Sequence, residues 1–131
     1  MTQRLSTEAF LKTETYEQLR RPVDQSTSLI PDAYTSYEFF SLEQKRVFPQ
    51  GWVAVGCVSE IKHPGIIKIR QVAEYSILLI RDQSGKLRAF QNVCRHIGTK
   101  LVTEEGSKKI LRCRYHGWTY GLNGRCKGMP F

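Results

Sequence analysis

Two short motifs in this chain each combine a thiol with an imidazole. Cys94-Arg95-His96 reads C-x-H, and Cys113-Arg114-Tyr115-His116 follows sixteen residues later and reads C-x-x-H. A glycine follows each motif, Gly98 in the first and Gly117 in the second, and lets the backbone approach a bound group closely. Thiolates and imidazoles on two separate loops can hold a metal. We therefore expect a metal centre with four ligands: Cys94, His96, Cys113 and His116.

Two kinds of metal centre use two thiolates and two imidazoles. Zinc binds such a set in one tetrahedron, whereas a two-iron cluster can take two Cys on one iron and two His on the other. Structural zinc sites more often pair like ligands along the chain, but each motif here gives one Cys and one His. If the two loops face each other, both Cys can point inward and both His outward. The spacing favours the cluster and leaves zinc as the alternative.

The elements that position these loops are predicted to be strands. Apolar or alternating runs predict strands over residues 52–58, 66–70, 75–81, 87–93 and 109–113. The last two end at the two Cys-His motifs. Asp82–Lys86 and Asn123-Gly124 have the residue types of hairpin turns. The pattern predicts a mainly β fold, a small antiparallel sandwich or barrel with a cluster-binding part.

The N-terminal third is predicted to be helical. A helix is expected over residues 4–21, capped by Ser6 or Thr7 and ended by Pro22, followed by a connecting arm to residue 35. Ser36 can cap a second helix that reaches Phe48. We therefore divide the chain into an N-terminal helix and arm, 1–35, and a metal-binding domain, 36–131.

Composition limits the class of protein and the cellular compartment in which such a metal centre would occur. The 131 residues are 40% apolar and 24% charged, as in one globular domain with a real core. There is no apolar run near the ~18 residues that span a bilayer, and the N-terminus lacks the apolar stretch of a secretory signal. We expect a cytoplasmic protein without a membrane partner. In that compartment thiols stay reduced, so Cys patterns indicate metal binding more often than disulfides.

The charge is uneven along the chain. The net charge is +8, and from Cys94 onward eight basic residues face only Glu104 and Glu105, which leaves +6 in the part with the motifs. No Lys/Arg run is interleaved with aromatic residues, so we do not expect a nucleic-acid partner. A basic surface around a redox centre would instead steer an acidic electron donor toward it. The alternative is a merely solvated surface.

The sequence around the motifs resembles the Rieske domain of ring-hydroxylating oxygenase α subunits, nearest to the choline-monooxygenase and aromatic-dioxygenase branch. The resemblance rests on the segments 91–98 and 111–124, and continues upstream through 43–48, 51–56, 81–82 and 85–90. It covers about residues 34–131. It implies a Rieske-type [2Fe–2S] cluster, with Cys94 and Cys113 on one iron and His96 and His116 on the other.

The resemblance also implies a function, electron transfer inside a larger oxidoreductase. Electrons would come from a reductase or ferredoxin and pass to a mononuclear iron held by two His and one carboxylate. Only His63 remains unassigned, so this chain cannot build that second iron site, which would lie in a missing catalytic domain. We expect a domain of a monooxygenase or dioxygenase, with a stand-alone Rieske carrier or a zinc-stapled structural module as alternatives.

Departures from respiratory Rieske proteins place the centre with the oxygenases. The extra Cys positions of those proteins correspond here to Thr99 and Tyr115, and their cluster-bonding Ser corresponds to Trp118. Fewer donors imply a reduction potential near the low end of the Rieske range, roughly −150 mV. Tyr120 remains a possible hydrogen-bond donor to the cluster.

The remaining candidates are predicted to play structural roles. Cys57 is expected in the core and Cys126 half exposed; His63 is expected on the surface. Trp52 and Trp118 are expected in the core, with Trp118 shielding the cluster.

Overall fold

The structure, a computed structural model, describes residues 5–130. The chain forms two compact units that divide between Trp52 and Val53. The boundary expected at residues 35 and 36 stays a prediction. The first residue of the expected helix 4–21 lies outside the described residues. Among the described residues, no helix is both long and apolar enough to cross a membrane.

The first unit consists of short helices. They are the α-helices α1 (Thr7–Phe10), α2 (Asp32–Thr35) and α3 (Tyr37–Leu42), the 3-10 helix η1 (Thr13–Tyr16) and the π-helical turn η2 (Glu43–Val47). Ser6 caps α1 and Ser36 caps α3, each through a hydrogen bond from a backbone N–H to the serine Oγ, as predicted. Phe10 is buried and packs edge-on against Phe39 at 5.1 Å, which joins α1 to α3.

The single helix expected over residues 4–21 is replaced by α1 and η1. The Thr15 hydroxyl donates to the Ala9 carbonyl at 2.6 Å, and the Tyr16 hydroxyl donates to the Phe10 carbonyl at 2.7 Å. These carbonyls would accept backbone N–H groups in a continuous helix. Side-chain donors that compete for the same acceptors favour a break.

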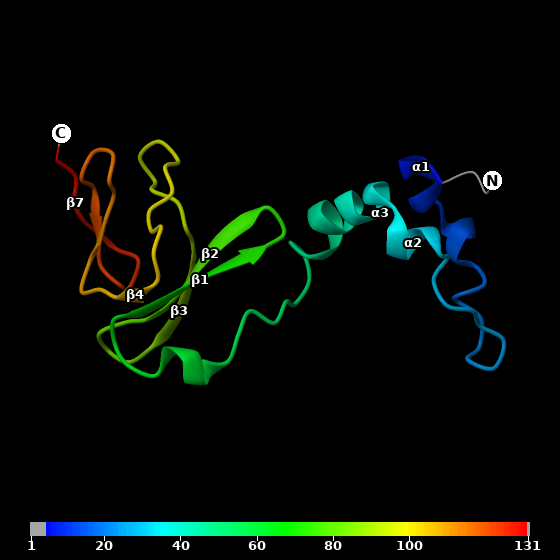
Figure 1. Ribbon diagram of the computed structural model, residues 1–131, viewed down its shortest axis with the longest axis horizontal. Helices are drawn as coiled ribbons and strands as arrows, with labels where there is room; N and C mark the ends of the chain where they lie inside the picture. The colour runs from blue at the N-terminus through cyan, green and yellow to red at the C-terminus, as the bar shows by residue number, and fades with distance from the viewer. Residues whose placement is uncertain (1–4, 131) are drawn as a thin grey trace. The chain divides into compact units, whose positions relative to one another are not determined.

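The second unit holds two antiparallel sheets (Figure 1). The four-stranded sheet has the order β3-β2-β1-β4, and the three-stranded sheet has the order β5-β6-β7. Their bounds are β1 (Ile66–Val72), β2 (Tyr75–Arg81), β3 (Leu87–Gln91), β4 (Gly106–Ser107), β5 (Leu111–Arg112), β6 (Thr119–Tyr120) and β7 (Cys126–Gly128). A 3-10 helix, η3 (Val58–Ile61), precedes β1. The expectation of a mainly antiparallel β fold is confirmed.

The strands pair as their sequence patterns predict. Ile67 lies opposite Ile80 and Ile69 opposite Leu78, so the alternating apolar side chains of β1 meet those of β2. The β2–β3 turn is closed by the Asp82 carboxylate, which accepts hydrogen bonds from the backbone N–H groups of Ser84 and Lys86, both at 2.9 Å. The hairpin turn predicted at Asp82–Lys86 is therefore present between β2 and β3.

One apolar core joins the two sheets. The four-stranded sheet contributes Ile67, Leu78 and Ile80, and the three-stranded sheet contributes Leu111 and Tyr120. The same cluster of buried side chains includes both cysteines of the motifs. The core therefore fixes the position of the two thiols as firmly as that of its aliphatic side chains.

The strand expected over residues 52–58 does not form. Residues 52–57 have no regular structure, and η3 follows at Val58. Trp52, expected in the core, is fully exposed, and Cys57, also expected there, is exposed. The segment has no regular structure that would place it in a sheet, so Val53 and Val55 are only half-buried and Trp52 and Cys57 are exposed.

Candidate metal centre

The two Cys-His motifs form loops that close in the same way. In loop 1, residues 94–99, the Cys94 N–H donates to the Thr99 carbonyl at 2.7 Å, and the Gly98 N–H donates to the Cys94 carbonyl at 3.0 Å. In loop 2, residues 113–118, the Cys113 N–H donates to the Trp118 carbonyl at 2.8 Å, and the Gly117 N–H donates to the Cys113 carbonyl at 3.1 Å. The spacing between the bonded residues is identical in both loops.

Each loop needs its glycine at the fourth position after the cysteine. Gly98 has φ +79° and Gly117 has φ +72°, in the left-handed region that favours glycine. Because the loops match, the imidazoles occupy different positions in them. His96 lies two residues after its cysteine and His116 lies three residues after its own.

The two thiols lie inward and close together. Cys94 is 1% exposed and Cys113 is 3% exposed. Burial raises the pKa of the Cys113 thiol, but hydrogen bonds from the backbone N–H groups of Tyr115 and His116 and from Cys94 outweigh it, so the pKa lies below its usual value. Backbone donors that favour a thiolate are suited to a metal ligand.

The two imidazoles lie outward. Both residues are exposed, and their rings meet edge-on with centroids 4.8 Å apart. The His96 ring also stacks on the Trp118 indole at 4.7 Å with an interplanar angle of 4°. The structure thus brings all four predicted residues together as a buried thiol pair and an exposed imidazole pair.

Tyr120 links the thiol pair to loop 1. Its hydroxyl lies 3.2 Å from the Cys94 Sγ and accepts a hydrogen bond from the Arg95 N–H at 3.1 Å. Since the oxygen accepts from Arg95, the hydroxyl proton is free to point at the sulfur. Burial, with the hydrogen bond to Cys94, raises the pKa of Tyr120 to about 12, which keeps it a donor.

Trp118 is half-buried against the core, as expected, beneath the His96 ring. Its Nε1 is buried and has no acceptor within residues 5–130. A buried N–H of this kind normally has a partner. The shielding of a cluster by Trp118 stays a prediction.

The donor set fits a two-iron cluster better than a single zinc ion. The thiols of Cys94 and Cys113 are buried as one pair, whereas the imidazoles of His96 and His116 are exposed and contact each other as a second pair. Tetrahedral zinc needs four such ligands around one point. In a cluster with mixed ligands each iron takes only two protein side chains, which the thiol pair and the imidazole pair supply.

The other candidate residues lie away from this arrangement. His63 is on the surface, as predicted. Cys126, expected half exposed, is exposed and lies opposite Tyr120 in the β6–β7 ladder. Neither shares the hydrogen bonds of the two loops.

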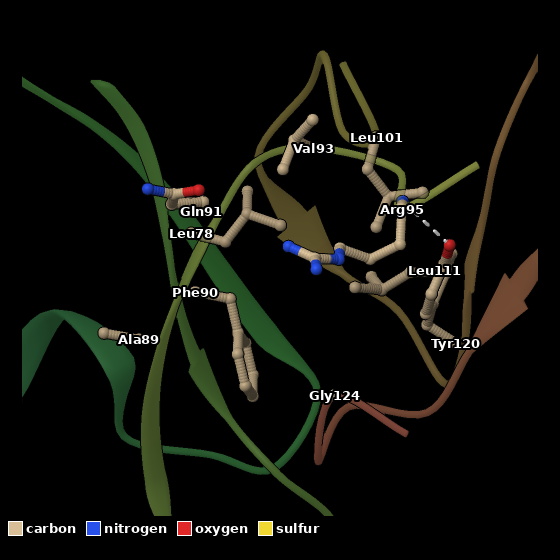
Figure 2. Close-up of a pocket in the computed structure, with 10 residues that line it drawn as sticks. All are labelled: Leu78, Ala89, Phe90, Gln91, Val93, Arg95, Leu101, Leu111, Tyr120 and Gly124. Atoms are coloured by element: carbon tan, nitrogen blue, oxygen red, sulfur yellow. Dashed lines mark hydrogen bonds between the residues drawn. The ribbon is translucent and has the colours of Figure 1, made fainter. Parts of the chain in front are cut away.

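A cavity of about 380 Å³ opens beneath loop 1 (Figure 2). Its walls come from β2 and β3 on one side and from loop 1, β5 and β6 on the other. Among residues 5–130, Arg95 is the one charged residue that lines it, and the Arg95 side chain extends between Leu78 and Leu111. No local sequence pattern predicts this cavity, because its walls come from segments far apart in the chain.

Comparison with known proteins places these features in a family. Residues 51–131 match the model of the Rieske [2Fe-2S] domain. The chain is 37% identical over 103 residues to the chloroplastic choline monooxygenase of Arabidopsis thaliana, which covers 79% of this chain and 24% of that protein. It is 31% identical over 119 residues to the biphenyl dioxygenase subunit alpha of Paraburkholderia xenovorans, covering 89% of this chain and 26% of that protein.

Solved structures show the same similarity. Naphthalene 1,2-dioxygenase from Rhodococcus sp., bound to indole, matches 92% of this chain and 28% of its own with a TM-score of 0.71 and 29% identity. The chain spans about a quarter of the length of the curated relatives it matches.

Proposed function

This chain belongs to the Rieske [2Fe-2S] domain family, and from this premise we propose that it transfers single electrons through a cluster bound by Cys94, Cys113, His96 and His116. Cys94 and Cys113 would bind one iron, and His96 and His116 the other. The observation that carries this proposal is the separation of the four side chains into a buried thiol pair and an exposed imidazole pair.

The residues around the cluster have distinct roles in electron transfer. The cluster supplies a one-electron couple whose potential is raised by exchanging two thiolates for neutral imidazoles. The Tyr120 hydroxyl donates toward Cys94, and the core around both thiols keeps water away. The exposed imidazole edges give a redox partner its shortest approach.

The role of the whole protein is proposed from its relatives. We place this domain in an oxygenase of the ring-hydroxylating type, where it accepts electrons from a reductase or ferredoxin and passes them to a mononuclear iron in another domain. Similarity to choline monooxygenase and to biphenyl and naphthalene dioxygenases supports this placement. We also propose a cytoplasmic location, since thiolate ligands persist in a reducing compartment.

The test is the identity of the metal. The chain, reconstituted with iron and sulfide, should be coloured, contain equal amounts of iron and acid-labile sulfide, and give a rhombic EPR signal on reduction. The Cys94→Ser and Cys113→Ser variants should lose the cluster, whereas Cys57→Ser and Cys126→Ser should retain it. A colourless protein that binds one zinc ion would contradict the proposal.

A further inference from the structure

The cavity beneath loop 1 has the composition of a small-molecule pocket. Its volume of about 380 Å³ lies within the range of about 300–1,000 Å³ that ligand pockets occupy. Most of its walls are apolar and come from separate segments: Leu78, Phe90, Val93, Leu101 and Leu111. Small-molecule pockets combine such walls with a few polar groups that orient the ligand. These walls therefore favour a ligand with an apolar body.

Arg95 places one positive charge in this cavity. Its side chain extends from loop 1 between Leu78 and Leu111 (Figure 2). The guanidinium has no hydrogen-bond acceptor and no carboxylate partner among residues 5–130; only the backbone N–H of Arg95 has an acceptor, the Tyr120 hydroxyl. A guanidinium is always charged, and its planar fork of N–H donors matches the geometry of a carboxylate.

Arginines of the neighbouring strands already have such a partner. Arg70 of β1 pairs with Glu105 at 2.9 Å, and Arg88 of β3 pairs with Asp82 at 2.9 Å. Arg95 differs from both because its guanidinium faces apolar walls and lacks a carboxylate. Arg95 is also an exposed residue, so a ligand can reach it from solvent. The partner that the chain does not supply is one that a bound carboxylate would supply.

The cavity borders the thiol pair through Tyr120. The Tyr120 side chain lines the cavity, and its hydroxyl lies 3.2 Å from Cys94 Sγ. The same hydroxyl accepts the Arg95 N–H at 3.1 Å, so Arg95 and Cys94 meet at one oxygen. An anion on Arg95 would therefore lie beside a ligand-bearing loop. Negative charge at that place opposes the addition of an electron to a cluster held by the loop.

We propose that this cavity binds a small monocarboxylate with an apolar body. The carboxylate pairs with the Arg95 guanidinium, and the apolar body lies between Leu78, Phe90 and Leu111. Binding favours the oxidised cluster and lowers its reduction potential, so the ligand regulates electron transfer. This effect on the potential rests on the proposed function, whereas the binding site itself requires only the cavity and Arg95.

The first experiment compares three probe molecules with the oxidised, cluster-loaded chain. Hexanoate has both features of the proposed ligand, acetate lacks the apolar body, and hexan-1-ol lacks the charge. Each is titrated at constant pH and ionic strength while NMR follows the amide signals of residues 78 and 89–91, which line the cavity. Hexanoate should bind at least about tenfold more tightly than either of the others. Hexanoate shifts that do not saturate, or that centre outside the cavity, would overturn the proposal.

Variants of Arg95 test the contact with the carboxylate. Arg95→Gln should weaken hexanoate binding at least about tenfold and leave hexan-1-ol binding within about twofold of the parent. Arg95→Lys keeps the charge but not the planar fork, so it should retain part of the affinity. Retention of the rhombic EPR signal on reduction shows that a variant still holds its cluster.

Arg114→Gln is the matched control for these variants. Arg114 follows Cys113 in loop 2 as Arg95 follows Cys94 in loop 1, but it does not line the cavity and its side chain is 73% exposed. The Arg114→Gln variant should bind hexanoate within about twofold of the parent. Equal losses in Arg95→Gln and Arg114→Gln would show a general effect of charge and would overturn the proposed site.

The second experiment measures the reduction potential by voltammetry with and without saturating hexanoate. If hexanoate binds the reduced chain about threefold more weakly, linkage requires the potential to fall by about 28 mV for a one-electron couple. Arg95→Gln at the same hexanoate concentration should show no shift. Saturable binding with an unchanged potential would overturn the regulatory part of the proposal. A chain that binds hexanoate through Arg95 but gives no rhombic EPR signal would instead remove the proposed function and keep the site.

Discussion

The side-chain amide of Asn92 and the backbone of Val102 form a reciprocal pair of hydrogen bonds across the base of loop 1. The Val102 N–H donates to Asn92 Oδ1 at 2.8 Å, and Asn92 Nδ2 donates to the Val102 carbonyl at 2.7 Å. Loop 2 is held by the β5–β6 ladder, whereas loop 1 has only the isolated bridge between Val93 and Lys100. The Asn92 amide therefore takes the place of a second ladder pair.

Replacing Asn92 should loosen loop 1. Asn92 is 4% exposed, so Asn92→Leu leaves the buried N–H and carbonyl of Val102 without partners and should cost about 2–3 kcal/mol in the free energy of unfolding. Urea unfolding measures this cost, and release of iron to a chelator should be faster. Ser76→Ala removes only the 3.2 Å contact of Ser76 Oγ with Asn92 Nδ2 and should cost less than about 1 kcal/mol. Equal costs for both variants would argue against this role.

Tyr120→Phe should lower the reduction potential. The hydroxyl proton stabilises negative charge on Cys94 Sγ, and that charge is greater in the reduced state. If the hydrogen bond stabilises the reduced state over the oxidised state by about 1 kcal/mol, its loss lowers the reduction potential of this one-electron couple by about 40 mV. Protein-film voltammetry would measure it, with Tyr115→Phe as the control because Tyr115 is exposed. An unchanged potential in Tyr120→Phe would show that the hydroxyl does not donate to the sulfur.

A thiolate in place of either imidazole should have a larger effect. His96→Cys or His116→Cys adds negative charge to the cluster and should lower the potential by about 100 mV or more, if the cluster is retained, since all-cysteine clusters lie well below the Rieske range. Voltammetry and EPR on the same samples would test this. His63→Cys is the matched control, because His63 lies on the surface outside both loops. Identical potentials in parent and ligand variants would contradict the assignment of ligands.

Asp82 should make stability depend on acid pH. Hydrogen bonds from the Ser84 side chain, and then from Arg88, outweigh burial and lower the pKa of Asp82 from 3.8 to about 2. Because the folded pKa is below the unfolded one, the carboxylate stabilises the fold above pH 3.8, and this contribution is lost as the pH falls from 3.8 to about 2.

Urea unfolding at about pH 7, 4 and 2.5 would test the role of Asp82. The Asp82→Asn variant should be less stable than the parent at neutral pH and should lose less stability on acidification. Glu74→Gln, at an exposed carboxylate without a hydrogen-bond partner in residues 5–130, should retain the acid response of the parent. A parent and an Asp82→Asn variant with parallel pH profiles would rule out this linkage.

The β1–β2 turn contains a correctable strain. Ala73 has φ +52°, which a side chain with a Cβ rarely adopts, while Val72 and Tyr75 pair across the turn. Ala73→Gly relieves the strain, and we expect a gain of about 0.5–1 kcal/mol in the free energy of unfolding, partly offset by the greater freedom of the unfolded chain. The Glu74→Gly variant, at a position where φ is not positive, should instead lower the stability of the fold. Thermal unfolding of both variants would test whether the two changes have these opposite effects.

Much of the β unit could be predicted from local sequence. The residue types at Asp82–Lys86 and Asn123-Gly124 predict turns because few residues adopt the backbone angles there, and Gly85 and Gly124 do have positive φ. The alternation in β1 predicts its buried face because side chains alternate between the two faces of a strand. The helix expected over 4–21 was wrong, because apolar spacing does not reveal that Thr15 and Tyr16 compete for backbone carbonyls.

The sequence by itself determined the chemistry of this protein. The order of Cys and His along the chain selects a donor set, and that order is independent of how the chain folds. Only the tertiary structure decided which donors are buried and which are exposed, since burial depends on packing between the two sheets. It also decided that Asn92 replaces a ladder pair and that Cys57 and Trp52 lie outside the core. No local pattern encodes these features, because they depend on which segments pack or pair with one another.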